Sequence, residues 1–316
     1  MKKTALLLFS GGLDSILAAE ILRKEKIKVA LVCCKSFFFD CQSAQRSARR
    51  LKLKLKVIAL SKEHLGTVKR PKYGRGQGMN PCIDCHILMI KKAKEILERE
   101  KLDFLATGEV LGERPFSQNR KIFQLAEKET ELESLILRPL SAKLLPLTIP
   151  EKRRWVKREN LFGFQGKSRK PQMVLAKKMK LKKFPTPAGG CILTDPEYSK
   201  RLRELFKKAP ECDGNDCQIL RKGRIFWLAT QSFGRVRQNR FLIIVGRNEK
   251  ENKQIHQLAG KKKKDLILEP QNFPGPTVLI RGFGKEIKKE KVLEATALLL
   301  NYSKKIPEKI IIEVKK

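Results

Sequence analysis

Short apolar runs separated by amphipathic segments make up the first half of the chain. Five of the runs are typical of buried β-strands, at residues 4–9, 27–33, 55–60, 104–107 and 134–137. Three segments have helical periodicity, at residues 15–23, 42–51 and 84–99. Strands that alternate with helices predict a parallel sheet covered on both faces. We therefore expect an α/β domain whose ligand binds at the carboxyl ends of the strands.

This rhythm changes near residue 200. Shorter strand-like runs, one helical segment and a last apolar run follow, at residues 224–229, 241–245, 265–268, 277–280, 289–301 and 309–314. The pattern predicts a smaller α+β domain. We place the two domains at residues 1–200 and 201–316, each long enough to bury a core of its own.

Lysine and arginine are in large excess, with 70 of them against 33 aspartates and glutamates and a formal net charge of +37. Because neutralising phosphates releases counterions, this excess predicts a polyanionic partner. Surface lysines that only solvate the fold are the alternative. No amphipathic helix with an aromatic anchoring face is visible, which favours nucleic acid over a membrane. With no long apolar run and no leader cleavage pattern, we expect a cytoplasmic protein.

A glycine-containing loop follows the first predicted strand. It reads SGGLDS, and its candidate phosphate-binding residues are Ser10, Gly11, Gly12, Asp14 and Ser15. Glycines let backbone N–H groups face an anion, and the helix that follows adds its positive N-terminal end. Asp14 can order the turn or help to hold Mg²⁺. No lysine precedes the last serine, so this is not a Walker A loop.

Eight cysteines in a chain without a secretion signal do not predict a disulfide framework. Cys82 and Cys85 open a helical segment, where thiols ionise more readily, and Cys191 follows a pair of glycines. This set is compatible with a redox dithiol, or with a zinc site that includes His86. We assign no catalytic role to the other five, Cys33, Cys34, Cys41, Cys212 and Cys217.

The loop resembles the SGGxDS motif of the PP-loop ATP pyrophosphatases. These enzymes cleave ATP between its α and β phosphates and adenylate a substrate carbonyl. Ala106-Thr107-Gly108 and Arg138-Pro139-Leu140 resemble segments of the tRNA thiolation branch, although residues 109–118 depart from its pattern. The resemblance implies an adenine nucleotide alpha hydrolase-like fold that binds ATP and Mg²⁺ through the loop, Thr107 and Gly108.

CxxC followed by one distant cysteine resembles the three-cysteine set of tRNA thiolases. Some of these enzymes hold a [4Fe-4S] cluster, whereas the 2-thiouridylases pass sulfur as a persulfide and have an aspartate where Cys82 stands. The additional soft ligand favours a cluster on Cys82, Cys85 and Cys191. A persulfide on Cys85 or Cys191, and structural zinc, remain alternatives. The resemblance also implies a sulfur donor, either a cysteine desulfurase or free sulfide.

The sequence around Gly246-Arg247-Asn248 resembles the NFACT-R RNA-binding domain. The resemblance implies RNA contacts by Arg235, Arg237, Arg240 and Arg247. In the first domain, the basic loop at residues 166–172 offers Arg169 and Lys170 as a phosphate clamp, unless it is a solvated turn.

These features lead to one hypothesis and two alternatives. The hypothesis is an ATP-dependent tRNA sulfurtransferase that forms 4-thiouridine or 2-thiouridine. The alternatives are an RNA-binding protein with a non-catalytic nucleotide fold, and a PP-loop enzyme that adenylates a small molecule.

Overall fold

The computed structural model describes residues 2–181, 184, 191–229, 240–260 and 263–315. The chain forms two compact units, Met1–Asp195 and Pro196–Lys316, and each contains a five-stranded sheet. The first sheet is parallel and the second antiparallel, so the predicted fold class is confirmed. Within the described ranges, no helix is long and apolar enough to cross a membrane.

The sheet of the first unit has the strand order β3-β2-β1-β4-β5. Its strands are β1 (Thr4–Leu8), β2 (Lys28–Lys35), β3 (Leu55–Ala59), β4 (Phe104–Thr107) and β5 (Ile136–Leu137). Because side chains alternate along a strand, Ala5 and Leu7 of the central β1 enter one core while Leu6 enters the other. The strand order reverses between β1 and β4, which places a ligand crevice at their carboxyl ends.

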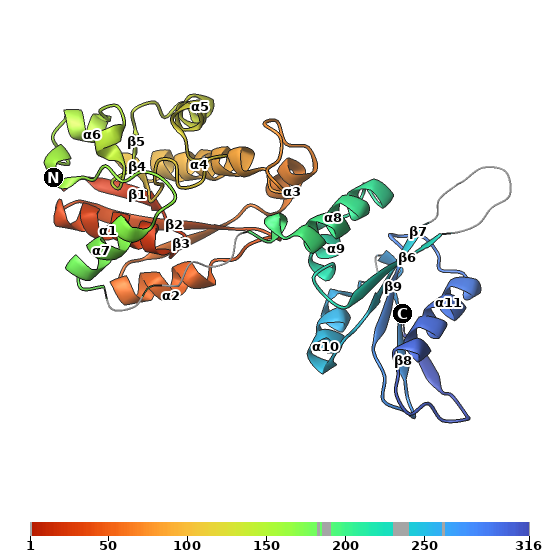
Figure 1. The fold of residues 1–316 in the computed structure, drawn as a ribbon. Coiled ribbons are helices and arrows are strands. Elements are labelled where there is room, and N and C mark those ends of the chain that lie inside the picture. Colours follow the sequence, from red (N-terminus) through yellow and green to blue (C-terminus); the bar gives the residue numbers. More distant parts are fainter. Residues whose placement is uncertain (1, 182–183, 185–190, 230–239, 261–262, 316) are drawn as a thin grey trace. The chain divides into compact units, whose positions relative to one another are not determined.

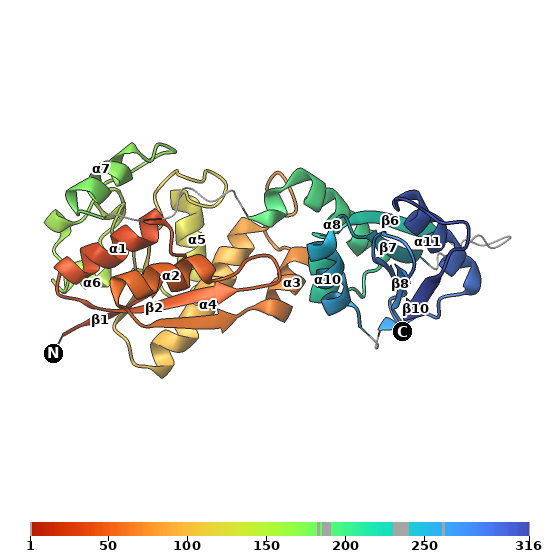
Figure 2. The ribbon, with the colours of Figure 1, turned by 90° about the horizontal axis from the view of Figure 1, so that it is seen from below.

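Helices cover both faces of this sheet. In Figures 1 and 2, α1, α2 and α7 lie on one face and α4 and α5 on the other. The helices are α1 (Leu13–Lys24), α2 (Gln42–Leu51), α3 (Ser61–Lys69), α4 (Cys82–Arg99), α5 (Arg120–Thr130), α6 (Ile149–Lys152) and α7 (Lys170–Lys178). The sequence pattern predicted only α1, α2 and α4. The expected basic loop at residues 166–172 is partly wrong, since Lys170 is the first residue of α7.

The second unit has the strand order β10-β8-β9-β7-β6. Its elements are α8 (Pro196–Lys208), α9 (Gly214–Ile219), β6 (Arg224–Ala229), β7 (Arg240–Val245), α10 (Glu249–Leu258), β8 (Leu266–Pro270), β9 (Val278–Arg281), α11 (Lys289–Asn301) and β10 (Ile312–Lys315). Ala295 and Leu299 of α11 pack against Phe241, Ile243 and Val245 of β7. Figure 1 shows α10 on the opposite face of this sheet.

A buried ion cluster joins the elements of the second unit. The guanidinium of Arg281 is fully buried, with Nη1 2.6 Å from Asp216 Oδ1 and Nη2 2.8 Å from Asp265 Oδ2. Nη2 also donates to the Leu258 carbonyl at 2.6 Å. Since burying an unpaired charge is costly, the two carboxylates hold Arg281 in place and connect α9, α10, β8 and β9.

Candidate active site

The SGGLDS loop lies at the carboxyl end of β1, where the strand order reverses. Gly11 has φ of 76°, and a Cβ atom there would lie 2.5 Å from the backbone of Ser43 and Ala44 at the start of α2. Only glycine fits this position. Ser15 Oγ accepts the Gly11 N–H at 3.1 Å and donates to the Gly12 carbonyl at 2.9 Å, so the loop's own hydroxyls order its turn.

The end of β4 packs directly against the start of α1. A Cβ atom on Gly108 would lie 2.6 Å from the Ser15 nitrogen and 2.7 Å from the Asp14 carbonyl carbon. This close approach requires glycine and places Thr107-Gly108 beside the SGGLDS loop. The structure therefore brings together the candidate nucleotide-binding residues that the sequence predicted on β1 and β4.

Arg169 reaches the same place from the start of α7. Its Nη2 lies 2.8 Å from Asp14 Oδ2, and its Nε lies 3.1 Å from Glu113 Oε1. Burial and the charge of Asp14 raise the pKa of Glu113, against the opposing charge of Arg169. The Arg169 guanidinium thus lies between the carboxylates of Asp14 and Glu113 at the edge of the loop. Arg169 therefore does not lie in a solvated turn, and its contact with a phosphate stays a prediction.

Glu109 follows Thr107-Gly108 and forms the centre of a charged network. His86 Nδ1 lies 3.0 Å from Oε1, Arg138 Nε lies 3.2 Å from Oε2, and Thr107 Oγ1 donates to Oε2 at 2.9 Å. Burial alone would raise the pKa of Glu109. The hydrogen bond with His86 and the charge of Arg138 outweigh it and lower the pKa to about 2. An ionised Glu109 therefore connects the start of α4 to the end of β4.

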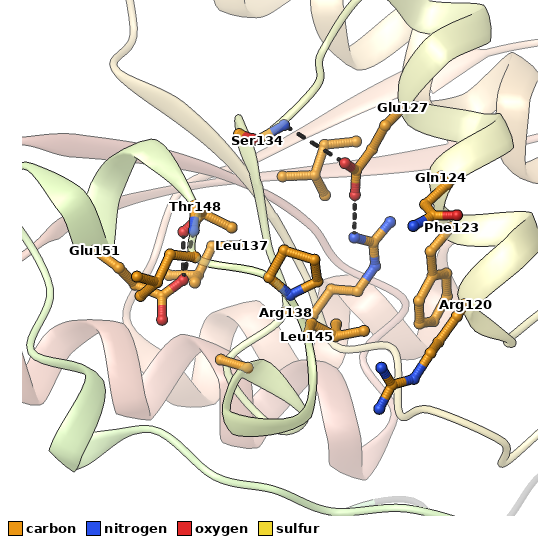
Figure 3. A pocket seen from close by; sticks show the side chains of 14 residues that line it. Arg120, Phe123, Gln124, Glu127, Ser134, Leu137, Arg138, Leu145, Thr148 and Glu151 are labelled. Carbon is orange, nitrogen blue, oxygen red and sulfur yellow. Dashed lines mark hydrogen bonds and ion pairs between the residues drawn. The ribbon is translucent and has the colours of Figure 1, made fainter.

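Arg138 extends this network along β5. Its Nη1 lies 2.6 Å from Glu127 Oε1, and its guanidinium covers the Phe123 ring at 4.0 Å from the centroid. Figure 3 shows Arg138 pointing toward Glu127, with Arg120 nearby, in a cavity of about 90 Å³. The Nη2 atom is buried and has no hydrogen-bond partner among the described residues. Arg138 of the RPL segment thus holds α5 and the loop after β4 against β5.

Cys82 and Cys85 lie in the first turn of α4, and tertiary contacts bring Cys191 close to them. The Met79 N–H donates to the Leu193 carbonyl at 2.8 Å, which holds the segment after Cys191 beside the start of α4. Burial raises the pKa of Cys85, and the charges of Cys82 and Cys191 raise it further. The three candidate sulfurs therefore lie within electrostatic reach of one another.

Two side chains with N–H groups contact these sulfurs. His64 Nε2 lies 2.7 Å from Cys85 Sγ, and Asn80 Nδ2 lies 3.1 Å from Cys82 Sγ. His64 is fully buried, and burial lowers its pKa to about 4, so the ring is neutral at pH 7. Its ring packs edge-on against Phe38 and Phe39. The sequence carried no signal for His64, because its partner depends on the packing of α3 against α4.

The predicted metal sites find less support. Cys82, Cys85 and Cys191 supply the soft donors of a [4Fe-4S] cluster. However, the described parts of the chain contain no group of three or more His, Cys, Asp or Glu side chains arranged to hold a metal ion. His86, which the zinc alternative includes, contacts Glu109 through Nδ1. A histidine that binds metal through Nε2 commonly makes such a contact, so this pair does not argue against zinc. The side chains of the described residues therefore do not form a metal site in this arrangement.

The remaining cysteines correct one expectation. Cys33 and Cys41 form a disulfide that links the end of β2 to the residue before α2, whereas the sequence predicted buried thiols. Their closeness in space could not be read from an eight-residue separation. Cys34 is free and buried, and burial raises its pKa to about 12. It is therefore an unreactive thiol beside the site.

The arginines predicted to bind RNA have different positions. Arg235 and Arg237 lie outside the described residues, and Arg240 is the first residue of β7. Arg247 is half-exposed, and its guanidinium pairs with Glu251. Glu251 Oε2 also accepts the Arg247 and Gly223 N–H groups at 3.1 Å, while Asn248 caps α10. The GRN segment therefore builds the turn from β7 into α10, and RNA contact by Arg247 stays a prediction.

Comparison with protein families finds one match at each end of the chain. Residues 235–316 match the NFACT protein RNA binding domain. Residues 1–132 match a family of unknown function, DUF7411.

Two curated relatives are tRNA-specific 2-thiouridylases MnmA. That of Karelsulcia muelleri is 29% identical over 133 residues, covering 38% of this chain and 34% of the relative. That of Caldicellulosiruptor saccharolyticus is 26% identical over 233 residues, covering 65% of this chain and 60% of the relative. The chain is a relative of the PP-loop tRNA thiolation enzymes. It spans less than two thirds of the length of either 2-thiouridylase.

Two solved structures are also similar to this chain. A 4-thiouridine synthetase in complex with RNA and bound ATP is 21% identical, with a TM-score of 0.38, over 69% of this chain and 52% of the other. The U34-tRNA thiolase NcsA of Methanococcus maripaludis with its [4Fe-4S] cluster is 20% identical, with a TM-score of 0.30, over 69% of each chain.

Proposed function

We propose that this protein is an ATP-dependent tRNA sulfurtransferase, which adenylates a uridine carbonyl and replaces its oxygen with sulfur. The observation that carries the proposal is the contact between the two halves of the site. His86, next to Cys85, pairs with Glu109, and Glu109 pairs with Thr107 at the nucleotide crevice. The cysteines and the SGGLDS loop thus share one edge of the sheet, as two consecutive reactions on one base require.

The first reaction takes place on ATP held by the loop, Thr107 and Gly108. The uridine carbonyl oxygen attacks the α-phosphorus, a new P–O bond forms, and the bond to the β-phosphate breaks to release pyrophosphate. Backbone N–H groups of the loop and the N-terminal end of α1 stabilise the negative charge that develops. Asp14 would help to hold the Mg²⁺ that accompanies the nucleotide, and this ion would supply positive charge beside the phosphates. Arg169, which pairs with Asp14 in this structure, would then be available to contact a phosphate.

The second reaction replaces oxygen with sulfur. The nucleophile, either the terminal sulfur of a cysteine persulfide or free sulfide, attacks the activated ring carbon. The C–O bond breaks, and AMP leaves with the former carbonyl oxygen. In the persulfide route, a cysteine desulfurase transfers a sulfane sulfur to Cys85 or Cys191, and its terminal sulfur attacks the base. The thiol of the other cysteine then breaks the S–S bond, which leaves the sulfur on the base and forms a Cys85–Cys191 disulfide that an external thiol reduces before the next turnover. Free sulfide, as the alternative donor, attacks the ring carbon directly. No step is assigned to an iron–sulfur cluster, because the described side chains do not form a metal site.

The second unit supplies RNA binding. Its match to an RNA-binding domain and the net charge of +37 both support a polyanionic partner. We assign tRNA as this partner, with Arg235, Arg237, Arg240 and Arg247 as candidate phosphate contacts and Lys170 as a further one beside the crevice.

A pair of cysteine variants tests the proposal. Cys191→Ser is expected to bind ATP as the wild type does and to lose tRNA thiolation, measured by mass spectrometry of digested tRNA. Cys34→Ala is the matched control, since Cys34 is a buried, unreactive thiol near the same edge. Unchanged thiolation in Cys191→Ser would remove its role. Absence of RNA-dependent conversion of ATP to AMP would favour an RNA-binding protein with a non-catalytic nucleotide fold.

The sulfur route needs a separate measurement. Anaerobic purification with iron, sulfide and zinc analysis tests the predicted cluster. About four irons per chain, lost in Cys82→Ala, would establish a [4Fe-4S] cluster. Active protein free of metal would establish persulfide transfer through Cys85 and Cys191, and stoichiometric zinc would make the three cysteines structural.

A further inference from the structure

The sulfurs of Cys82 and Cys85 each contact one side-chain nitrogen atom, from Asn80 and His64 respectively. The question that decides their chemistry is which atom carries the hydrogen. A neutral thiol can donate its S–H and accepts hydrogen bonds only weakly, whereas a thiolate is a hydrogen-bond acceptor only. Two N–H donors aimed at these sulfurs therefore favour the charged form over the thiol.

At Cys82, the other hydrogen bonds of Asn80 show which atom is the donor. Its Oδ1 accepts the Gly78 N–H at 3.0 Å, and its backbone carbonyl accepts the Gly76 N–H at 2.9 Å. If the amide were flipped, its NH₂ group would face the Gly78 N–H, donor against donor. Nδ2 therefore points to Cys82 Sγ as a donor at 3.1 Å.

His64 behaves in the same way at Cys85. A neutral imidazole carries one N–H, and Nδ1 of this buried ring has no hydrogen-bond partner among the described residues. A buried N–H without a partner is rarer in proteins than an unsatisfied acceptor. The hydrogen therefore belongs on Nε2, which lies 2.7 Å from Cys85 Sγ.

We propose that His64 and Asn80 are positioning residues that donate N–H···S hydrogen bonds to Cys85 and Cys82 and hold these sulfurs for transfer. The bonds fix the direction of both sulfurs and stabilise negative charge on them. At Cys85, the His64 bond opposes the effect of burial, which disfavours a charged sulfur. The start of α4 acts in the same direction, because Cys82 is the first residue of an 18-residue helix.

The proposal deepens the proposed function, since it names the residues that prepare the sulfur for the second reaction. It needs no metal, and it applies equally to a persulfide and to sulfide bound in another form. Both donors come from segments next to the start of α4, since His64 lies on helix α3 and Asn80 lies two residues before α4.

A spectroscopic test does not depend on activity. The chain has only three histidines, so ¹⁵N-histidine labelling resolves each ring in a long-range ¹H–¹⁵N spectrum. We expect His64 as the Nε2–H tautomer, with an Nε2 resonance that moves in Cys85→Ala and stays in Cys212→Ala. His256 is the internal reference. A His64 ring protonated on Nδ1 would overturn the proposal, because Cys85 would then be the donor.

Variants test the consequence for sulfur transfer. His64→Leu removes the donor, and Asn80→Asp removes the NH₂ group while it keeps the oxygen that accepts the Gly78 N–H. Each is expected to reduce the tRNA thiolation rate roughly 10- to 100-fold, in the range for residues that orient reactive ligands, with ATP affinity unchanged. His64→Gln, which retains an N–H donor of similar reach, is expected to recover most of the rate. Equal loss in His64→Gln and His64→Leu would show that His64 acts only by filling space.

The two proposals can fail separately. Wild-type protein that thiolates no RNA but shows the expected His64 tautomer would end the proposed function and leave the sulfur contacts intact. Wild-type thiolation with a His64 ring protonated on Nδ1 would do the reverse.

Discussion

Glu109→Gln is expected to destabilise the first unit in a pH-dependent way. The carboxyl is largely buried, and its partners lower the pKa from 4.5 to about 2. A depression of this size corresponds to about 3 kcal/mol of unfolding free energy at neutral pH. The pKa is lower in the folded state, so this stability is present above about pH 4.5 and is lost as the pH falls toward 2. Removing the charge should therefore cost about 3 kcal/mol at pH 7 and much less at pH 3.

Urea unfolding followed by tryptophan fluorescence measures this effect. The chain has two tryptophans, and a Trp227→Phe background leaves Trp155, which packs against Phe104 of β4, as the reporter of the first unit. The unfolding free energy of Glu109→Gln should approach that of the parent as the pH is lowered from 7 to 3.

Glu113→Gln is the matched control, because its pKa is shifted in the opposite direction. Burial and the charge of Asp14 raise the pKa of Glu113, so its contribution is present at low pH and is lost as the pH rises through the folded-state pKa. This variant should lose little stability at pH 7 or gain some. If the two variants had parallel pH profiles, or if Glu109→Gln lost under 1 kcal/mol at pH 7, the network around Glu109 would not be ionised as described.

Two further changes test the backbone of the loop and the ion cluster of the second unit. Gly11→Ala should lower the unfolding free energy by more than about 1 kcal/mol and abolish ATP binding, because its φ is 76° and its Cβ would strike the start of α2. Gly12→Ala, whose Cβ meets its nearest atom at 3.4 Å, should cost less in the same thermal denaturation series. Arg281→Leu should cost about 3–5 kcal/mol in urea unfolding followed by Trp227, since two buried carboxylates lose their partner. Arg203→Leu, at an exposed position of α8, should change stability by less than about 0.5 kcal/mol, and a similar loss in both variants would contradict a special role for Arg281.

Local sequence was enough to predict the parallel strands and the loop of the first unit. Its central strands β1, β2 and β4 are nearly continuous apolar runs, because both faces of the sheet are covered there, and such runs are easily recognised in the sequence. Gly11 and Gly108 were predicted to lie near the nucleotide. The structure shows that Gly11 also packs against the backbone at the start of α2, and Gly108 against the backbone at the start of α1. Helices α3 and α7 were not predicted because each has only 9 residues, fewer than α1, α2 or α4, and so gives a weaker amphipathic period. Helix α5, with 11 residues, was also missed.

The sequence by itself determined the α/β class, the SGGLDS loop after β1, the cysteines at the start of α4 and the strongly basic surface, since each depends on neighbouring residues or on composition alone. Only the tertiary structure decided which side chains meet at the site. His64 reaches Cys85, Arg169 reaches Asp14, and Arg138 reaches Glu109. These pairs are separated by 21, 155 and 29 residues, and they form because helix packing and the carboxyl edge of a parallel sheet collect distant segments. A local sequence pattern cannot predict such neighbours, because they depend on how whole helices and strands pack to bury their apolar surfaces.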